Sequence, residues 1–344
     1  MTKTNIFILL IAAVIGFSAC DNTLDILDEY DDFPVVYGLL NRNDSAHFIR
    51  VQKGFLGEGN ALLMAQYPDS IYYDTAKVEI HVYERVNKVA KDTMLLRPNF
   101  GFTKNEGLFT DEKHIVYQLY KQIRETNGTI TYDPFFPLKN DADYTLEIKN
   151  KMSGKVTTAT TTLVETISQL NLFPSTKVNL ASEFPFNVKI SSGKNGKVYG
   201  LIMRFKYKEI NISSGNAVDK YVDYYLPNQT SLNTNGGQIL TFLLDGQVIF
   251  RYLKEKIKKD PLVYRPIGFI DADYIFTVGS EDLYNYIQVN APGNTVNYIP
   301  EYTNLSNGKG IFTSRWISTS PNIKFNSPTQ DSLLNSQYTK GLFN

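Results

Sequence analysis

Residues 141–148 read Asp-Ala-Asp-Tyr-Thr-Leu-Glu-Ile, and they guide the interpretation of the first half of the chain. Apolar and polar side chains alternate here, which is the pattern of a half-buried β-strand. Tyr144 opens this strand after a polar corner, and a turn at Ser153-Gly154 leads to a second strand-like run over 156–164. The first half of the chain is therefore predicted to close with two consecutive β-strands.

A tyrosine that opens a late strand resembles the tyrosine corner of immunoglobulin-like β-sandwiches. Short strand-like runs upstream favour the same architecture; they lie at 35–40, 47–51 and 78–83. The stretch 114–136 fits either a helical face or a hairpin at Asn127-Gly128, and we favour the hairpin. We expect a mainly β chain that begins with an immunoglobulin-like β-sandwich over residues 34–165.

The second half predicts another β-rich domain, over residues 166–344, with one or two short helices. Its strand-like runs lie at 186–190, 198–207, 220–226 and 239–244. Asp245 and Ser280 stand where N-caps of two helices are expected, because their side chains can accept hydrogen bonds from the first free N–H groups. The residues after Ser318 are rich in Ser, Asn and Pro, so we expect a loose C-terminal tail.

Composition excludes several classes of protein. With 35 basic and 35 acidic residues the chain has no basic surplus, so we expect no nucleic-acid partner. A hydrophobic content of 42% is enough for packed cores, and the abundance of Tyr and Phe favours strands. A single cysteine excludes an internal disulfide and a thiolate metal site.

The N-terminus has the sequence pattern of a targeting signal. Lys3 precedes an apolar run over 6–17, and Phe17-Ser18-Ala19 leads directly into Cys20. The run is shorter than the roughly 20 residues that a membrane span needs, so it predicts a signal peptide over 1–19. Cys20 resembles the cysteine of a bacterial lipobox, which implies acylation and a lipid anchor in a membrane. The alternative is ordinary secretion with a free thiol.

An acidic segment follows the cysteine. Residues 20–33 contain six Asp and Glu residues and no Lys or Arg. Such a run is typical of a solvated, flexible tether. It is also similar to the segment that directs lipoproteins of Bacteroidota to the outer face of the outer membrane, which implies a location at the cell surface.

Two further phrases carry a resemblance. They are Val35-Val36-Tyr37-Gly38-Leu39 near the start, and Tyr298-Ile299-Pro300, Asn304 and Asn307-Gly308-Lys309-Gly310-Ile311-Phe312 near the end. With the lipobox and the domain order, they resemble an uncharacterised family of Bacteroidota lipoproteins, a domain of unknown function. The resemblance implies association with a TonB-dependent outer-membrane receptor and an accessory role in uptake. Gly308 and Gly310 predict positive φ in a tight turn, and a ligand-gripping loop is the alternative.

Catalytic chemistry has little support in the sequence. The three histidines, His47, His81 and His114, do not have the spacing of a zinc hydrolase, and there is no Gly-x-Ser-x-Gly elbow. We therefore expect no enzymatic activity, no cofactor and no metal. The acid pairs Asp141/Asp143 and Asp271/Asp273 keep calcium open as an alternative to simple turn residues.

Five triplets consist of Asp, then Ser or Thr, then a small or aliphatic residue. Their hydroxyl residues are Ser45, Ser70, Thr75, Thr93 and Ser332. The triplet resembles the acceptor motif for O-glycosylation of exported Bacteroidota proteins, and all five are expected in or beside loops. The alternative is that Asp-Ser and Asp-Thr favour turns and caps.

Aromatic side chains offer a platform for a sugar ring, or simply core packing. The candidates are Tyr72-Tyr73, Tyr224-Tyr225 and Trp316. Taken together, the sequence predicts a non-enzymatic outer-membrane lipoprotein that binds a glycan or peptide ligand as an accessory to a TonB-dependent receptor. The alternative is a structural fimbrial or adhesin-type surface subunit.

Overall fold

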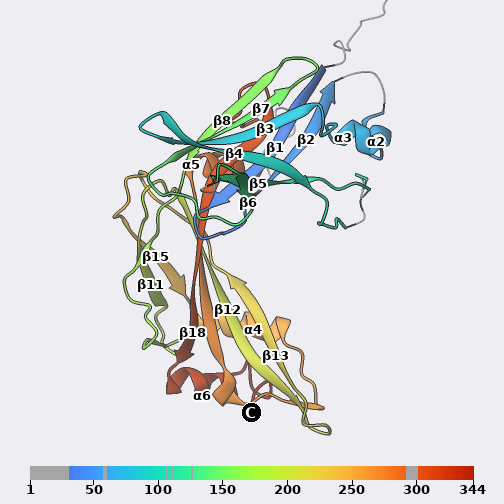
Figure 1. The fold of residues 1–344 in the computed structure, drawn as a ribbon. Coiled ribbons are helices and arrows are strands. Elements are labelled where there is room, and N and C mark those ends of the chain that lie inside the picture. Colours follow the sequence, from blue (N-terminus) through green and yellow to red (C-terminus); the bar gives the residue numbers. More distant parts are fainter. Residues whose placement is uncertain are drawn as a thin grey trace, which may run out of the picture.

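A computed structural model describes residues 31–56, 60–105, 107, 109–110, 112–124, 127–291 and 301–344. The predicted signal peptide over 1–19, Cys20 and nearly all of the acidic tether over 20–33 lie outside these residues. Within the described residues the chain is mainly β, as the sequence predicts, with one long mixed sheet and one small sheet. The long sheet runs through an upper and a lower part of the molecule (Figure 1).

The upper part consists of the first eight strands and two one-turn helices. The strands are β1 (Asp31–Asn41), β2 (Phe48–Leu56), β3 (Val78–Val86), β4 (Val89–Asn99), β5 (Val116–Arg124), β6 (Ile130–Asp133), β7 (Asp143–Asn150) and β8 (Val156–Thr162). The helices α2 (Ala61–Met64) and α3 (Pro68–Ile71) follow β2. These strands form a curled sheet, because its last strand, β8, returns to the segment before β18 through a bridge between Thr158 and Ser306.

The lower part contains the remaining elements. Its strands are β9 (Ser168–Gln169), β10 (Lys177–Val178), β11 (Phe186–Ser191), β12 (Val198–Asn211), β13 (Ala217–Tyr225), β14 (Gln229–Thr230), β15 (Ile239–Leu244), β16 (Val263–Tyr264), β17 (Asp271–Gly279) and β18 (Lys309–Phe325). Its helices are α4 (Gly246–Lys256), the 3-10 turn η1 (Ile267–Phe269), α5 (Glu281–Val289) and α6 (Ser327–Asn335).

Strand β18 joins the two parts. Along 309–315 it pairs in parallel with β1, and along 315–323 it pairs antiparallel with β17. The strand order of the long sheet is therefore β13-β12-β17-β18-β1-β2-β5-β4-β3-β7-β8. On the same strand, Phe312 is buried in the upper core and Trp316 in the lower core.

The buried hydrophobic side chains of the described residues form two clusters. In the first half of the chain, Leu163 is the last residue of the upper cluster, and the lower cluster begins at Val164. Leu305 and Phe312, much later in the chain, also belong to the upper cluster. The predicted domain boundary at 165/166 lies close to this division, and it stays a prediction.

Two local features of the upper part were predicted from the sequence. The Tyr144 hydroxyl accepts a hydrogen bond from the Lys139 N–H (2.6 Å) and donates one to the Lys139 carbonyl (3.1 Å), which is the geometry of a tyrosine corner. Strands β5 and β6 pair as a hairpin, and Gly128 in their connection has φ +80°. The two predictions of a tyrosine corner and of a hairpin are confirmed.

Both predicted helix caps are confirmed. The Asp245 carboxylate accepts hydrogen bonds from the N–H groups of Gln247 and Val248 at the start of α4. The Ser280 hydroxyl accepts one from Leu283 at the start of α5. These bonds satisfy N–H groups that have no partner inside the helix.

The prediction of a loose C-terminal tail after Ser318 is wrong. Strand β18 continues to Phe325 and α6 follows. Leu342 and Phe343 are both 3% exposed, and the Phe343 ring lies 5.8 Å from that of Phe205. The Asn344 carbonyl accepts a hydrogen bond from the Ile267 N–H. A few apolar residues scattered in a polar stretch fill the lower end of the core, which composition alone does not reveal.

Candidate functional site

A cavity of about 550 Å³ opens in the upper part, beside the start of β1, and we call it the upper cavity. Asp32 of β1 and Lys53 of β2 lie on its wall, together with α3 and the segment before β5. Asp32 also borders a neighbouring hollow of about 500 Å³. Volumes of this size are typical of sites for small molecules.

Charged groups of both signs line the upper cavity. Three lysines, Lys53, Lys77 and Lys113, face three aspartates, Asp32, Asp69 and Asp74. Lys53 Nζ donates to the backbone carbonyl of Asp69 (2.6 Å), and Lys77 forms an exposed ion pair with Asp74 (3.6 Å). The cavity therefore offers donors and acceptors in balance, which suits a polar ligand without a large net charge.

Aromatic side chains form the apolar part of the same cavity. Tyr72 and Tyr73 line it but are largely buried, whereas Phe100 is 61% exposed. The Tyr72 hydroxyl is 2.9 Å from His114 Nδ1. Burial, with Arg50 and Lys104 nearby, lowers the pKa of His114, so its ring is neutral at pH 7. The bond to His114 therefore fixes the position of Tyr72 in the wall of the cavity.

Asn307, Gly308 and Lys309 border the neighbouring hollow, together with Asp32 and Lys155. Gly310 has φ +93° and Asn307 has φ +52°, whereas Gly308 does not take positive φ, so the prediction for Gly308 is wrong. The Asn307 carbonyl accepts a hydrogen bond from Thr157 Oγ1 (2.9 Å). The loop is therefore tied to β8, which supports the turn interpretation.

The five predicted glycosylation acceptors lie in different settings. Ser45 and Thr75 are exposed in a bend and a turn, and Thr93 is exposed within β4. Ser70 lies in α3 and Ser332 in α6, where both are half-buried. The expectation that all five lie in or beside loops is therefore wrong for Thr93 and Ser332, because turn-forming sequences also occur inside regular elements.

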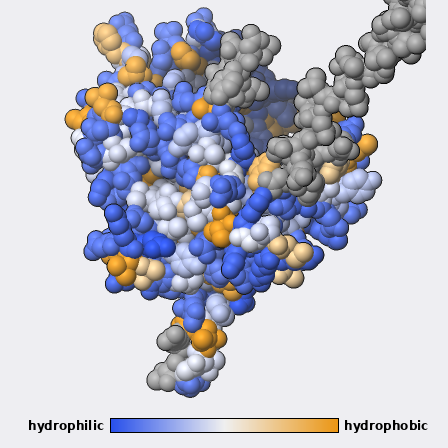
Figure 2. All heavy atoms as spheres, turned by 90° about the horizontal axis from the view of Figure 1, so that it is seen from above, coloured by the Kyte–Doolittle hydropathy of each residue, from blue (hydrophilic) through white to orange (hydrophobic). Residues whose placement is uncertain are grey.

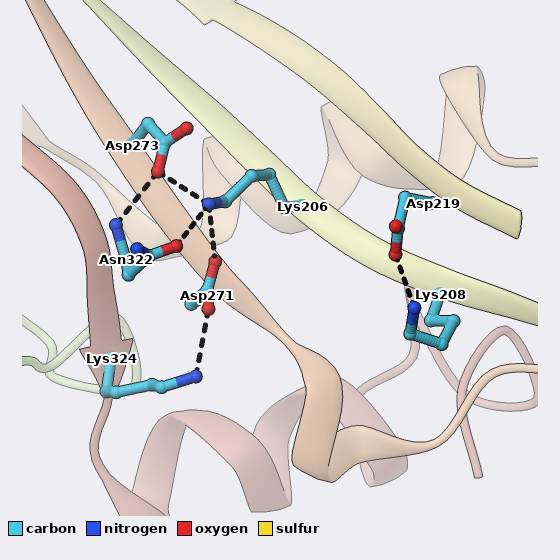
Figure 3. A network of polar contacts seen from close by, with 7 residues as sticks. All are labelled: Lys206, Lys208, Asp219, Asp271, Asp273, Asn322 and Lys324. Carbon is cyan, nitrogen blue, oxygen red and sulfur yellow. Dashed lines mark hydrogen bonds and ion pairs between the residues drawn. The ribbon is translucent and has the colours of Figure 1, made fainter. Parts of the chain in front are cut away.

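Both carboxylates of the acid pair Asp271/Asp273 form ion pairs with lysines. Lys206 Nζ lies 3.1 Å from Asp271 and 2.7 Å from Asp273, and Lys324 Nζ lies 2.8 Å from Asp271 (Figure 3). Of the other pair, Asp141 is exposed and Asp143 borders a separate hollow of about 350 Å³. Within the described residues no group of three or more His, Cys, Asp or Glu side chains is placed to hold a metal ion.

The remaining predicted aromatic platforms differ in exposure. Tyr224 packs edge-on against Tyr252 at 5.2 Å, and Trp316 is 5% exposed. Tyr225 is 66% exposed. Tyr221, which is 59% exposed on the same strand as Tyr225, was not among the predicted platforms. The sequence of β13 could have predicted this, because side chains two residues apart along a strand lie on the same face of the sheet.

Seen from above, the described surface of the molecule is mainly hydrophilic, and hydrophobic residues appear as small separate spots (Figure 2). Large continuous apolar areas mark protein or membrane contacts, and this view shows none among the described residues. Of the helices in the described residues, none combines the length and hydrophobicity needed to span a membrane.

The described chain is thus a mainly β protein with one long sheet, two hydrophobic cores and a polar cavity beside its first strand. No protein-family model matches it, and no curated protein matches its sequence. Among solved structures it is similar to the C-terminal globular domain of oligosaccharyltransferase from Pyrococcus abyssi, with 11% identity and a TM-score of 0.25. That match covers 72% of this chain and 46% of the other, and it says nothing about function.

Proposed function

We propose that this chain is a non-enzymatic outer-membrane lipoprotein that binds a ligand and works with a TonB-dependent receptor in substrate uptake. The sequence supports the anchor, because Cys20 directly follows a predicted signal peptide with small residues at its end. The acidic residues that follow support a location at the cell surface, in line with the family resemblance.

The position of the upper cavity carries the proposal. Asp32 lies on its wall, and the chain between Cys20 and Asp32 is short. Even fully extended, these residues span at most roughly 40 Å, at about 3.3–3.6 Å per residue. A ligand in the cavity is therefore held close to the membrane surface, within reach of a receptor embedded there.

The residues around the cavity favour ligand binding over catalysis. Lys53 and Lys77 are engaged with Asp69 and Asp74, and His114 is bonded to Tyr72. Side chains that hold one another in place preserve the shape of a site and leave its remaining donors and acceptors for a ligand. A small polar molecule or a short peptide fits this combination of rings and balanced charge.

A pull-down from the native host tests the proposal. The full-length chain with a C-terminal tag is extracted in mild detergent, and its partners are identified by mass spectrometry. We expect a large β-barrel receptor in near-equal amount. Lys53→Glu/Lys77→Glu is expected to retain the receptor while losing the small ligand that co-purifies. Recovery without any barrel contradicts the proposal.

A structural fimbrial or adhesin-type subunit is the second candidate, and the end of the long sheet favours it. Within the described residues β13 is the last strand of the sheet order, and its side chains are largely exposed. A strand at the end of a sheet can pair with a strand of another chain. Copies of this chain as the main partner in the same pull-down support this candidate instead.

A further inference from the structure

The lower sheet has an outer face that points away from the lower core. Along β12, Leu201, Met203 and Phe205 are buried in that core. Because side chains alternate along a strand, Arg204, Lys206 and Lys208 lie on the opposite side. Their ion-pair partners on β13 and β17 lie on this side too (Figure 3). We call this side the outer face.

Three tyrosines lie on the outer face in regular rows. In the register of the sheet, Tyr225 pairs with Ile202, Tyr221 with Lys206 and Tyr264 with Ile210. Their exposed fractions are 66%, 59% and 43%. Rows four residues apart along one strand are separated by about 13 Å, so the three rows extend over roughly 26 Å. The rings therefore mark out an elongated track rather than a single spot.

The charges of the outer face compensate one another. Four basic residues, Arg204, Lys206, Lys208 and Lys324, pair with four aspartates, Asp219, Asp223, Asp271 and Asp273. Arg204 binds Asp223 through two bonds of 2.7 and 2.8 Å, and Lys208 lies 2.6 Å from Asp219. These pairs therefore carry no net charge, so this part of the face exerts little long-range attraction on a polyanion or a polycation.

Cations of these ion pairs also contact two aromatic rings. The Arg204 guanidinium lies 4.3 Å from the centre of the Tyr221 ring, and Lys208 Nζ lies 5.7 Å from that of Phe269, which is 56% exposed. A cation against a ring restrains it. Rings that are already ordered lose little conformational entropy when a ligand stacks on them.

We propose that the outer face binds a neutral glycan chain that lies along the strands of the lower sheet. The C–H face of a pyranose packs on an aromatic ring, and its hydroxyl groups can share hydrogen bonds with the carboxylates and ammonium groups between the rings. A balanced surface with spaced rings suits an uncharged polymer of sugars better than a charged one. This site is separate from the upper cavity and does not depend on the function proposed above.

Native affinity electrophoresis tests this proposal. The purified full-length chain, kept in mild non-ionic detergent, is run through gels containing galactomannan, xyloglucan or amylopectin, and through gels containing polygalacturonate or heparin. We expect at least one neutral polymer to retard the protein. Tyr221→Ala/Tyr225→Ala is expected to weaken that binding at least tenfold, and Tyr221→Phe/Tyr225→Phe to keep it. Phe184→Ala, which removes a ring 79% exposed elsewhere in the lower part, is the matched control.

Several results would overturn the glycan site. They are no retardation by any neutral polymer, retardation by the polyanions alone, or equal binding by the double alanine variant. Loss of a stoichiometric protein partner in that variant, with no polymer bound, assigns the face to a protein instead. If the double variant fails to fold, Tyr225→Ala and Tyr264→Ala are measured singly, and unchanged binding in both rejects the proposal.

Discussion

Gly310 of β18 packs directly against the backbone of Val36, its register partner on β1. Gly310 has φ +93°, and a Cβ atom at this position would overlap the Val36 carbonyl oxygen. The parallel pairing of β1 with β18 joins the upper and lower parts of the sheet. The absence of a side chain at residue 310 therefore allows the two parts to meet.

Gly310→Ala is expected to destabilise the protein by at least about 2 kcal/mol, since it adds both strain at positive φ and a clash with the backbone. The free energy of unfolding in urea measures the effect. Gly107→Ala is the control, because among the described residues no atom lies within 4 Å of a Cβ atom placed there. Equal stability of the two variants would show that β1 and β18 do not pack this closely.

Phe343→Ala is expected to cost about 3 kcal/mol or more, because it leaves a cavity beside Phe205 in the lower core. Thermal unfolding of the full-length chain measures the loss. The exposed Phe184 provides the comparison, and its replacement by Ala is expected to change stability by less than about 0.5 kcal/mol. A small loss of stability at both positions would indicate that the C-terminus is a loose tail.

Stability is expected to fall as the pH drops through 6.5. Burial lowers the pKa of His47, although its bond to the Phe136 carbonyl and the charge of Asp44 oppose this, and burial also lowers the pKa of His114. Near pH 6.5 the unfolded chain therefore binds more protons than the folded chain, so acid favours unfolding. Urea unfolding between pH 5.5 and 7.5 measures the slope.

The double variant His47→Gln/His114→Gln is expected to flatten this dependence on pH, whatever its absolute stability. His81→Gln serves as the control for replacement of a histidine as such. An unchanged slope in the double variant would place the proton uptake elsewhere.

Cys20→Ala is expected to move the protein from the membrane fraction to the soluble fraction, because it removes the thiol that would carry the lipid. Fractionation of the native host with and without detergent measures the distribution. Ser18→Ala keeps the thiol and a small residue before it, so it is expected to remain in the membrane. A soluble wild-type protein would favour ordinary secretion.

Thr75 is the acceptor that we expect to carry a glycan, since it is exposed in a turn where a bulky sugar meets little resistance. Ser332 is half-buried within α6 and is expected to stay unmodified. Intact mass and peptide mapping of protein from the native host measure both sites. A mass equal to protein plus lipid would exclude glycosylation.

The sequence by itself predicted the features that depend on neighbouring residues. The tyrosine corner of Tyr144, the hairpin at Asn127-Gly128 and the caps at Asp245 and Ser280 each rest on a short segment. Alternation along a strand and side-chain bonds to nearby N–H groups follow from local geometry, so they can be recognised before the fold is known.

Tertiary structure decided everything that joins distant segments. The pairing of β1 with β18 and the burial of Phe343 depend on residues far away in the chain, as does the place of Tyr264 beside β12. The upper cavity likewise arises where separate strands and loops converge. Hydrophobic burial is non-directional. A pattern in the sequence therefore predicts that a side chain is buried, but not which distant segment it packs against.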